Sequence, residues 1–324
     1  MLGRHHRTTI TYVLAQPKML QLVQLRGCCP DIKLPLGLAL FLAKMFLSQR
    51  PFSPRRPKLR QSSPNAKSAS PAPKGRLDYV TSIRRSGTRD HVCTGVLISP
   101  WHVLTAAHCV DPDSHYSAGS RPVVHIGATS VEQMDSNEIE VRLVQKSDIH
   151  TEWIKGGKVQ RSPHNIAVLR LAQPSSRPMP NLLSDHFKVT TGTKLAACGW
   201  GPESGGPALG EAIFGALTVE RQEFIDATTC NWTTLWDGAM PSGMFCALNE
   251  GHKASCVIDS GSPLMVLDAP SYDVGSGKAD FDFLVGLNVD GAPCGADGKP
   301  DICVDIRQHH AFIEAIINEG HDEL

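Results

Sequence analysis

The chain has 324 residues, enough for one large domain or two small ones, and its formal net charge is zero. The charge is unevenly placed. Residues 1–75 hold 13 Lys and Arg against one acid, Asp31, and the remainder holds 19 Lys and Arg against 31 acids. An acidic body argues against nucleic-acid binding, so no nucleic-acid partner is expected.

Residues 1–75 are predicted to be a leader and linker that is disordered or removed. The apolar run Leu34–Ala43 follows Lys33 and has the length of a signal-peptide core, which is too short for a stable membrane span. It lies far from Met1, so either Met1 is not the true start or the leader is unusual. The basic, acid-poor composition also fits an organelle transit peptide. From residue 49 to 75, Pro, Ser, Arg and Lys predominate, which favours a flexible linker.

Residues 76–318 are predicted to form one all-β domain, because short apolar or alternating runs are separated by turn-forming residues. The predicted strands are Tyr79–Ile83, Gly95–Ile98, Val123–Ile126, Ile139–Val144, Ile166–Leu171, Lys194–Ala197, Ala212–Val219, Leu264–Leu267, Phe283–Leu287 and Ile302–Ile306. Apolar residues at helical spacing then predict a terminal helix over His310–Asn318.

Two short motifs indicate the secretory pathway. The tail, residues 319–324, ends in His321-Asp322-Glu323-Leu324, which has the form of a retrieval signal of the endoplasmic reticulum (ER). We therefore expect an ER retrieval receptor as a partner and the ER lumen as the location, with the extracellular space as the alternative. The run Asn231-Trp232-Thr233 is a glycosylation acceptor by pattern.

Two distant segments carry residues typical of nucleophilic catalysis. His108 lies in Leu104–Cys109, and Ser260 lies in Cys256–Pro263. A histidine between Ala-Ala and Cys, with a downstream Cys-x-x-Asp-Ser-Gly run, resembles the chymotrypsin/trypsin family of serine proteases. The resemblance covers about residues 72–317. It implies a chymotrypsin-like double β-barrel with a short C-terminal helix, a site in the cleft between two six-stranded barrels, and no cofactor or metal.

The resemblance also implies three disulfides and hence an oxidising compartment. The expected pairs are Cys93–Cys109, Cys230–Cys246 and Cys256–Cys294. Cys198 and Cys303 lie where the family usually has other residues, and they either pair with each other or remain two buried thiols.

The acid of the catalytic triad is replaced by an amide. In the family a serine attacks the substrate carbonyl, a histidine takes its proton, and a carboxylate holds the histidine tautomer. His108 and Ser260 keep the first two roles, but the third position is Asn165. An amide cannot compensate an imidazolium, and in a member of this family the same Asp-to-Asn change lowers kcat about 10⁴-fold.

Two further departures affect the loop that stabilises the oxyanion. Ile258 stands where the family has a glycine whose N–H is an oxyanion donor, and loss of one donor costs roughly 10²–10³-fold. Asp259 should pair with a new N-terminal ammonium after activation. The segment Ala66–Ala69 lacks the Ile/Val-Ile/Val-Gly-Gly start that would supply this ammonium.

The expected substrate pocket also departs from the family. Val289, Asp290 and Gly291 stand where the family has a Ser-Trp-Gly strand edge. Ala254 at the pocket base removes the trypsin carboxylate, and Asp301 replaces a glycine of the pocket wall. Asp301 either attracts a basic side chain or fills the pocket, and the second is favoured.

These changes favour a serine protease homologue with little or no peptidase activity. Starting from about 10 s⁻¹, a loss near 10⁶ leaves about one turnover per day. We expect instead that a protein or peptide partner binds in the cleft between the barrels. The alternative is an active serine endopeptidase that uses Ser260 and His108.

Overall fold

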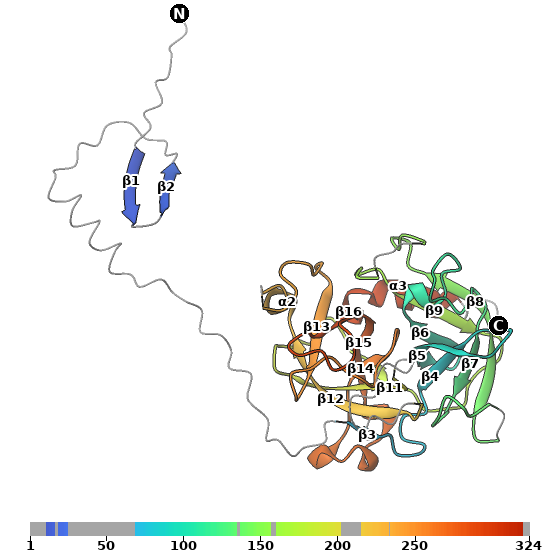
Figure 1. Ribbon diagram of the computed structural model, residues 1–324. Helices are drawn as coiled ribbons and strands as arrows, with labels where there is room; N and C mark the ends of the chain where they lie inside the picture. The colour runs from blue at the N-terminus through green and yellow to red at the C-terminus, as the bar shows by residue number, and fades with distance from the viewer. Residues whose placement is uncertain are drawn as a thin grey trace, which may run out of the picture. The chain divides into compact units, whose positions relative to one another are not determined.

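The computed structural model describes residues 11–16, 19–24, 69–134, 137–156, 160–201, 215–232 and 234–319 (Figure 1). The chain divides into a unit of residues 1–58 and a unit of residues 59–324. In the first unit, strands β1 (Thr11–Gln16) and β2 (Met19–Gln24) pair as an antiparallel hairpin. The apolar run Leu34–Ala43 and the final five residues lie outside the described chain.

The first barrel of the second unit closes through six antiparallel strands in the order β4-β5-β6-β9-β8-β7. Its strands are β4 (Val80–Arg84), β5 (His91–Ser99), β6 (His102–Thr105), β7 (Val123–Ile126), β8 (Glu140–Ile149) and β9 (Ala167–Leu171). Every residue of β4, β6 and β7 is buried, because their side chains face the barrel interior on one side and neighbouring structure on the other.

The second barrel is built from the C-terminal half of the unit. Its strands are β11 (Lys194–Gly199), β12 (Thr218–Ile225), β13 (Met244–Asn249), β14 (Pro263–Val266), β15 (Phe283–Asp290) and β16 (Asp301–Asp305). Pairing of β15 with β16 closes the ring. Two short strands add to it: β3 (Ala69–Pro71) pairs with β12, and β10 (Asn181–Leu182) runs parallel to β15.

Helical structure is sparse. The short 3-10 turns are η1 (Ala107–Cys109), η2 (Pro270–Tyr272), η3 (Val274–Ser276), η4 (Ala279–Phe281) and η5 (Ile306–Gln308), and the α-helices are α2 (Ala227–Cys230) and α3 (His310–Glu319). Helix α3 confirms the predicted terminal helix, and it buries Ile313 and Ile316. No helix in the described chain is long and apolar enough to cross a membrane.

The all-β double barrel confirms the predicted fold, although individual strands depart from the sequence pattern. Strands β6 and β13 were not predicted, because neither His102–Thr105 nor Met244–Asn249 has the alternating pattern that separates strands from other buried segments. Regular structure also begins earlier than Arg76, since β3 gains its backbone partners from a strand almost 150 residues away. The predicted strand Ala212–Val219 lies partly outside the described chain, and β12 begins at Thr218.

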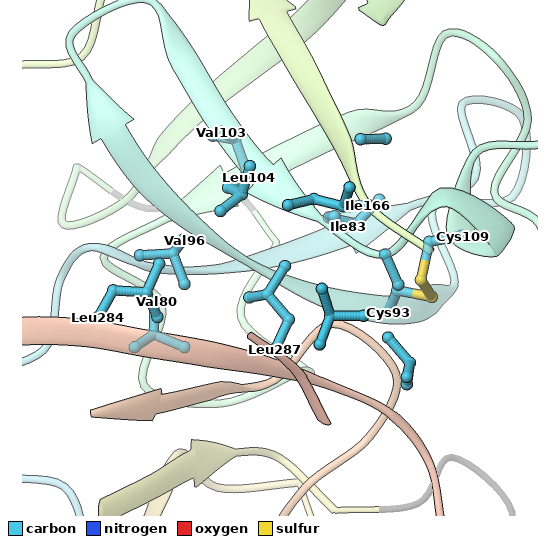
Figure 2. Packing of buried hydrophobic residues seen from close by; sticks show 14 of the residues in the cluster. Val80, Ile83, Cys93, Val96, Val103, Leu104, Cys109, Ile166, Leu284 and Leu287 are labelled. Atoms are coloured by element: carbon cyan, nitrogen blue, oxygen red, sulfur yellow. A yellow bond between two sulfur atoms is a disulfide. The ribbon is translucent and has the colours of Figure 1, made fainter. Parts of the chain in front are cut away.

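One apolar cluster joins the two barrels. Leu284 and Leu287 of β15 lie beside Val80 and Val96 of the first barrel (Figure 2). The neighbouring Val285 instead belongs to a separate cluster of the second barrel. The register of β15 against β14 shifts between Leu284 and Gly286, so Leu284 and Leu287, although three positions apart, reach the same cluster. Strand β15 therefore contributes apolar side chains to the contact between the barrels.

The three predicted disulfides are confirmed. The Cα–Cα distances are 6.1 Å for Cys93–Cys109, 6.1 Å for Cys230–Cys246 and 4.7 Å for Cys256–Cys294. The first links β5 to η1, so it holds His108 against the barrel wall, and it is visible in Figure 2. Cys198 and Cys303 are both buried free thiols, which resolves the alternatives that the sequence left open.

Replacing Leu287 by Ala is expected to lower the free energy of unfolding by about 2–5 kcal/mol, because the side chain is fully buried where the barrels meet. Urea denaturation measures the loss. Leu143→Ala is the matched control, since Leu143 lies on β8 and is 62% exposed. The same loss in both variants would contradict this role of β15.

Candidate active site

The described elements bring His108 and Asn165 into direct contact. His108 lies in η1, directly after β6, and Asn165 directly precedes Ile166 and β9, the strand that pairs with β6. Both side chains are completely buried. Pairing of two adjacent strands therefore places the histidine and the amide together, as a triad geometry requires.

Two backbone groups fix the orientation of the Asn165 amide. Its Oδ1 accepts a hydrogen bond from the backbone N–H of His108 at 3.1 Å, and its Nδ2 donates to the carbonyl oxygen of Gln160 at 2.7 Å. The two ends of an amide are told apart by their partners, and here one partner can only donate while the other can only accept. Both atoms of the amide reach His108 Nδ1: Nδ2 lies 2.8 Å from it and Oδ1 lies 3.1 Å from it. Because Nδ2 is the nearer atom and Oδ1 already accepts from the backbone, we assign the amide as the donor to the imidazole.

This contact sets the tautomer of His108. Because Nδ1 accepts a hydrogen bond, the proton of the neutral ring is on Nε2. A general base in this chemistry needs a bare Nε2 to take the proton of the serine. His108 Nε2 is buried and has no hydrogen-bond partner in the described part of the chain, so no bond to Ser260 is formed.

The surroundings keep His108 neutral. Burial lowers the pKa of His108 to about 4 and outweighs the opposing influence of the hydrogen bond with Asn165 and of the charges of Asp290 and Asp111. Asp111 accepts hydrogen bonds from Trp153 Nε1 at 2.9 Å and from the Gly156 backbone at 2.8 Å. Neither carboxylate hydrogen-bonds the imidazole, so neither replaces the missing triad acid.

The backbone of the serine loop is held by the first barrel. The carbonyl oxygen of Ser260 accepts from the Thr94 backbone N–H at 2.9 Å. Gly261 has a φ of +83°, and a Cβ there would lie 2.1 Å from the Thr94 carbonyl oxygen. Only glycine permits this conformation and this approach, so Gly261 of the sequence motif is structurally required.

Asp259 faces the first barrel rather than an N-terminal ammonium. His91 Nε2 lies 2.6 Å from Asp259 Oδ2, and Ser82 Oγ lies 2.8 Å from His91 Nδ1. The hydroxyl of Ser262 donates to the other carboxylate oxygen at 2.5 Å. The sequence motif identified Asp259, but it gave no sign of His91 or Ser82, because these partners lie far away in the chain.

Ile258 is buried among the apolar side chains of the second barrel. It belongs to the same cluster as Val257, Leu264 and Val285. Burial of an isoleucine side chain contributes roughly 1.5–3 kcal/mol, so this contact stabilises the loop in its present conformation. Its φ is not in the positive range, which is the conformation that a β-branched residue tolerates.

Asp301 fills the space below Gly291. A Cβ on Gly291 would lie 3.1 Å from Asp301 Oδ1, and Oδ2 accepts from the Ser255 backbone at 3.0 Å and from Gln222 Nε2 at 3.3 Å. Asp301 is only 4% exposed, and in the described chain no cation pairs with it. Burial raises the pKa of Asp301 to about 7. This supports the interpretation that the residue fills the pocket.

An ion pair spans the two barrels beside His108. Arg161, in the segment before Asn165, donates from Nε to Asp290 Oδ2 at 2.9 Å. Its guanidinium also lies 4.3 Å from the ring centroid of Trp236. Asp290 belongs to the predicted substrate edge. Arg161 is therefore hydrogen-bonded to a carboxylate that a substrate backbone or side chain would approach. Sequence reasoning missed Arg161 and Trp236, because neither belongs to a motif.

The structure also gives the positions of Ala254, Val289 and Asn231, whose predicted roles stay predictions. Ala254 and Val289 are buried at the expected pocket. The side-chain amide of Asn231 exchanges hydrogen bonds with the backbone of Met240, at 2.9 and 3.1 Å. Glycosylation at Asn231 stays a prediction, because Thr233 lies outside the described residues.

Comparison with known proteins agrees with this architecture. A family profile described as Trypsin matches residues 67–313, so the chain belongs to the trypsin family of serine proteases. It is 31% identical to bovine chymotrypsin-like elastase family member 1 over 209 residues, 63% of this chain and 73% of the relative. It is 28% identical to the human protein of that name, over 72% of this chain and 84% of the relative. Human kallikrein-8 is 27% identical, over 70% and 77%.

Asp301→Asn is expected to raise the free energy of unfolding at pH 8 by about 1–3 kcal/mol. The pKa of Asp301 is about 7 in the folded state and near 4 when unfolded, so folding opposes ionisation. The stability associated with this residue is present below pH 4 and is lost as the pH rises to 7. The gain should therefore vanish near pH 4 in urea titrations. The measured quantity is the unfolding free energy of Asp301→Asn minus that of wild type. If this difference were smaller at pH 8 than at pH 4, it would contradict the raised pKa.

Proposed function

We propose that this member of the trypsin family is a binding protein that does not turn over peptide bonds. The observation that carries the proposal is the amide of Asn165, which donates to His108 and leaves Nε2 protonated. Without a proton acceptor, the hydroxyl of Ser260 is not activated for attack. An active endopeptidase is the competing function, and no contact in the described site favours it.

The oxyanion loop supports the same proposal independently. Its Asp259 is engaged by His91, and Ile258 is packed into the second barrel. Moving the loop to another conformation would break the His91–Asp259 hydrogen bond and expose an isoleucine side chain. Restoring the triad acid alone should therefore not restore an efficient enzyme, because the site would still lack a prepared oxyanion hole.

The proposed ligand is a protein or an extended peptide that lies along the Asp290–Gly291 edge of β15. The edge carries a carboxylate whose one charged partner in the described chain is the partly exposed Arg161, while its other oxygen accepts from the Gly291 backbone, so a ligand with a basic group would compete with Arg161 for Asp290. The three disulfides favour an oxidising compartment of the secretory pathway. Residence in the ER lumen is part of the proposal, with an extracellular location as the alternative.

The absence of turnover is tested with four purified proteins. These are the wild-type chain, Asn165→Asp, Ser260→Ala, and the variant that combines Asn165→Asp with Ser260→Ala. Wild type should hydrolyse peptide and denatured-protein substrates no faster than Ser260→Ala, and a fluorophosphonate probe should leave Ser260 unlabelled. Asn165→Asp should gain at most a trace of Ser260-dependent hydrolysis, because Ile258 and the Asp259 contact remain. Wild-type turnover in the range of about 1–10³ s⁻¹ would establish an active endopeptidase instead.

Ligand binding is tested separately with a displayed library of random peptides. Wild type and Ser260→Ala should enrich the same sequences, since the proposed binding does not use the hydroxyl. Asp290→Asn should weaken the enriched basic peptides at least about tenfold, because it removes the carboxylate that they would pair with. Glu314→Gln, an exposed acid on α3, is the control for charge alone. No enrichment on the wild type, or equal loss in both acid variants, would refute this binding edge.

A further inference from the structure

A cluster of three histidines and one glutamate lies outside the residues that the proposed function uses. His150 follows β8, Glu152 lies in the next turn, His164 precedes Asn165, and His309 joins η5 to α3. The rings of His150 and His164 are stacked with their centroids 4.7 Å apart. The ring of His309 lies 5.1 Å from His150 and 6.1 Å from His164. Three separate segments of the chain thus meet at one group of imidazoles.

We propose that His150, Glu152 and His164 form a binding site for a divalent transition-metal ion of the zinc class. One donor atom from each residue lies within 4.8 Å of the other two. His164 Nε2 and Glu152 Oε2 are already 3.3 Å apart, which is close to the edge of a tetrahedron with metal bonds of about 2.1 Å. Two imidazoles and one carboxylate are a donor set that zinc uses, with a remaining position for water.

A second observation points to a missing cation. His164 Nδ1 and His309 Nε2 are buried and have no hydrogen-bond partner among the described residues. The Pro163 carbonyl accepts a hydrogen bond from His309, and it can accept only from a protonated ring nitrogen, so Nε2 keeps a bare lone pair in the neutral ring. Buried nitrogens without partners are costly in a folded protein. The described chain therefore leaves polar nitrogens of this cluster unmet. The donor of the proposed site on His164 is the other ring nitrogen, Nε2, and His309 is a neighbour of the site and not one of its three ligands.

Solvent reaches the donors of the proposed site. The ion can enter from solvent, because the side chain of Glu152 is 69% exposed and that of His164 is 30% exposed.

A second group of possible donors does not compete for this assignment. His108 lies near the sulfur atoms of Cys93 and Cys109, but those sulfurs are joined in a disulfide and do not provide thiolates. We expected no metal from the sequence, because the family motifs do not include His150, Glu152 or His309.

Zinc binding would affect the segment that carries Asn165. His164 is its direct neighbour, and Pro163 bonds His309 at the start of α3. An ion on His150, Glu152 and His164 would join the end of β8 to this segment. We therefore expect zinc to raise the thermal midpoint of the folded protein, since a ligand that binds only the folded state stabilises it.

The test uses the full chain, with zinc chloride titrated by calorimetry and followed by thermal denaturation, and with cobalt as a spectroscopic probe. Wild type should show a zinc-dependent rise in the midpoint and the visible absorption bands of tetrahedral cobalt. His164→Ala and His150→Ala should each weaken zinc at least about tenfold and lose the cobalt bands. His186→Ala is the matched control, because His186 also has an acidic neighbour, Asp185, but its side chain is 90% exposed and outside the cluster.

A further variant separates metal binding from misfolding. Glu152→Gln changes an exposed side chain, so its midpoint without zinc should equal that of wild type while its zinc affinity falls. Zinc that binds elsewhere on the chain contributes equally to wild type and to all variants, so a difference in zinc affinity between them reports on the cluster. Equal zinc affinity in wild type, His164→Ala and Glu152→Gln would overturn the proposal and leave the cluster as stacked side chains only.

Discussion

The amide of Asn165 lies between a backbone donor, the N–H of His108, and a backbone acceptor, the carbonyl of Gln160. A carboxylate at this position could accept from both His108 Nδ1 and the backbone. The amide instead uses its oxygen on the backbone and presents its nitrogen to the ring. One backbone group belongs to η1 and the other to the segment before β9, so reversal of the amide would leave its two ends facing like partners in a buried site. The protonation state of the whole site follows from this local hydrogen-bond requirement.

The oxyanion loop adds a constraint of a different kind. Asp259 is bound by His91 across the barrel boundary, and Ile258 contributes apolar surface to the second barrel. These contacts stabilise the loop in its present conformation, and in the proposed function the same contacts oppose rearrangement toward catalysis. Effects within one catalytic unit are not additive, so repair of one residue cannot be expected to recover a fixed share of activity. The proposed loss of turnover therefore rests on two separate places in a scaffold that keeps the trypsin fold.

Local patterns in the sequence were sufficient for much of the fold. Short alternating segments located most strands, helical spacing located α3, and the family motif identified His108, Asn165 and Ser260 together with the three disulfides. The sequence could not show that Asn165 is oriented by Gln160, because that depends on which backbone groups face the amide. It also could not show the His91–Asp259 and Arg161–Asp290 contacts, which join residues 168 and 129 positions apart.

The histidine cluster shows a similar limit. His150 and His164 lie on segments that only the pairing of β8 with β9 brings together, and His309 arrives from the far end of the second barrel. The spacing of these histidines in the sequence does not predict that they cluster. Metal motifs whose ligands share one helix or turn can, in contrast, be found from spacing. A histidine of this cluster can bind a metal only if one of its ring nitrogens has a lone pair that no other group uses. The hydrogen-bond partners in the folded chain decide this, and the sequence does not show them.

The tautomer of His108 is the central claim, and nitrogen NMR of the protein labelled with ¹⁵N-histidine measures it directly at neutral pH. The account predicts a proton on Nε2 and a bare Nδ1 in the wild type, with the proton moved to Nδ1 in Asn165→Asp. A wild-type spectrum with Nδ1 protonated and Nε2 bare would contradict the account, because His108 would then be able to accept the proton of Ser260.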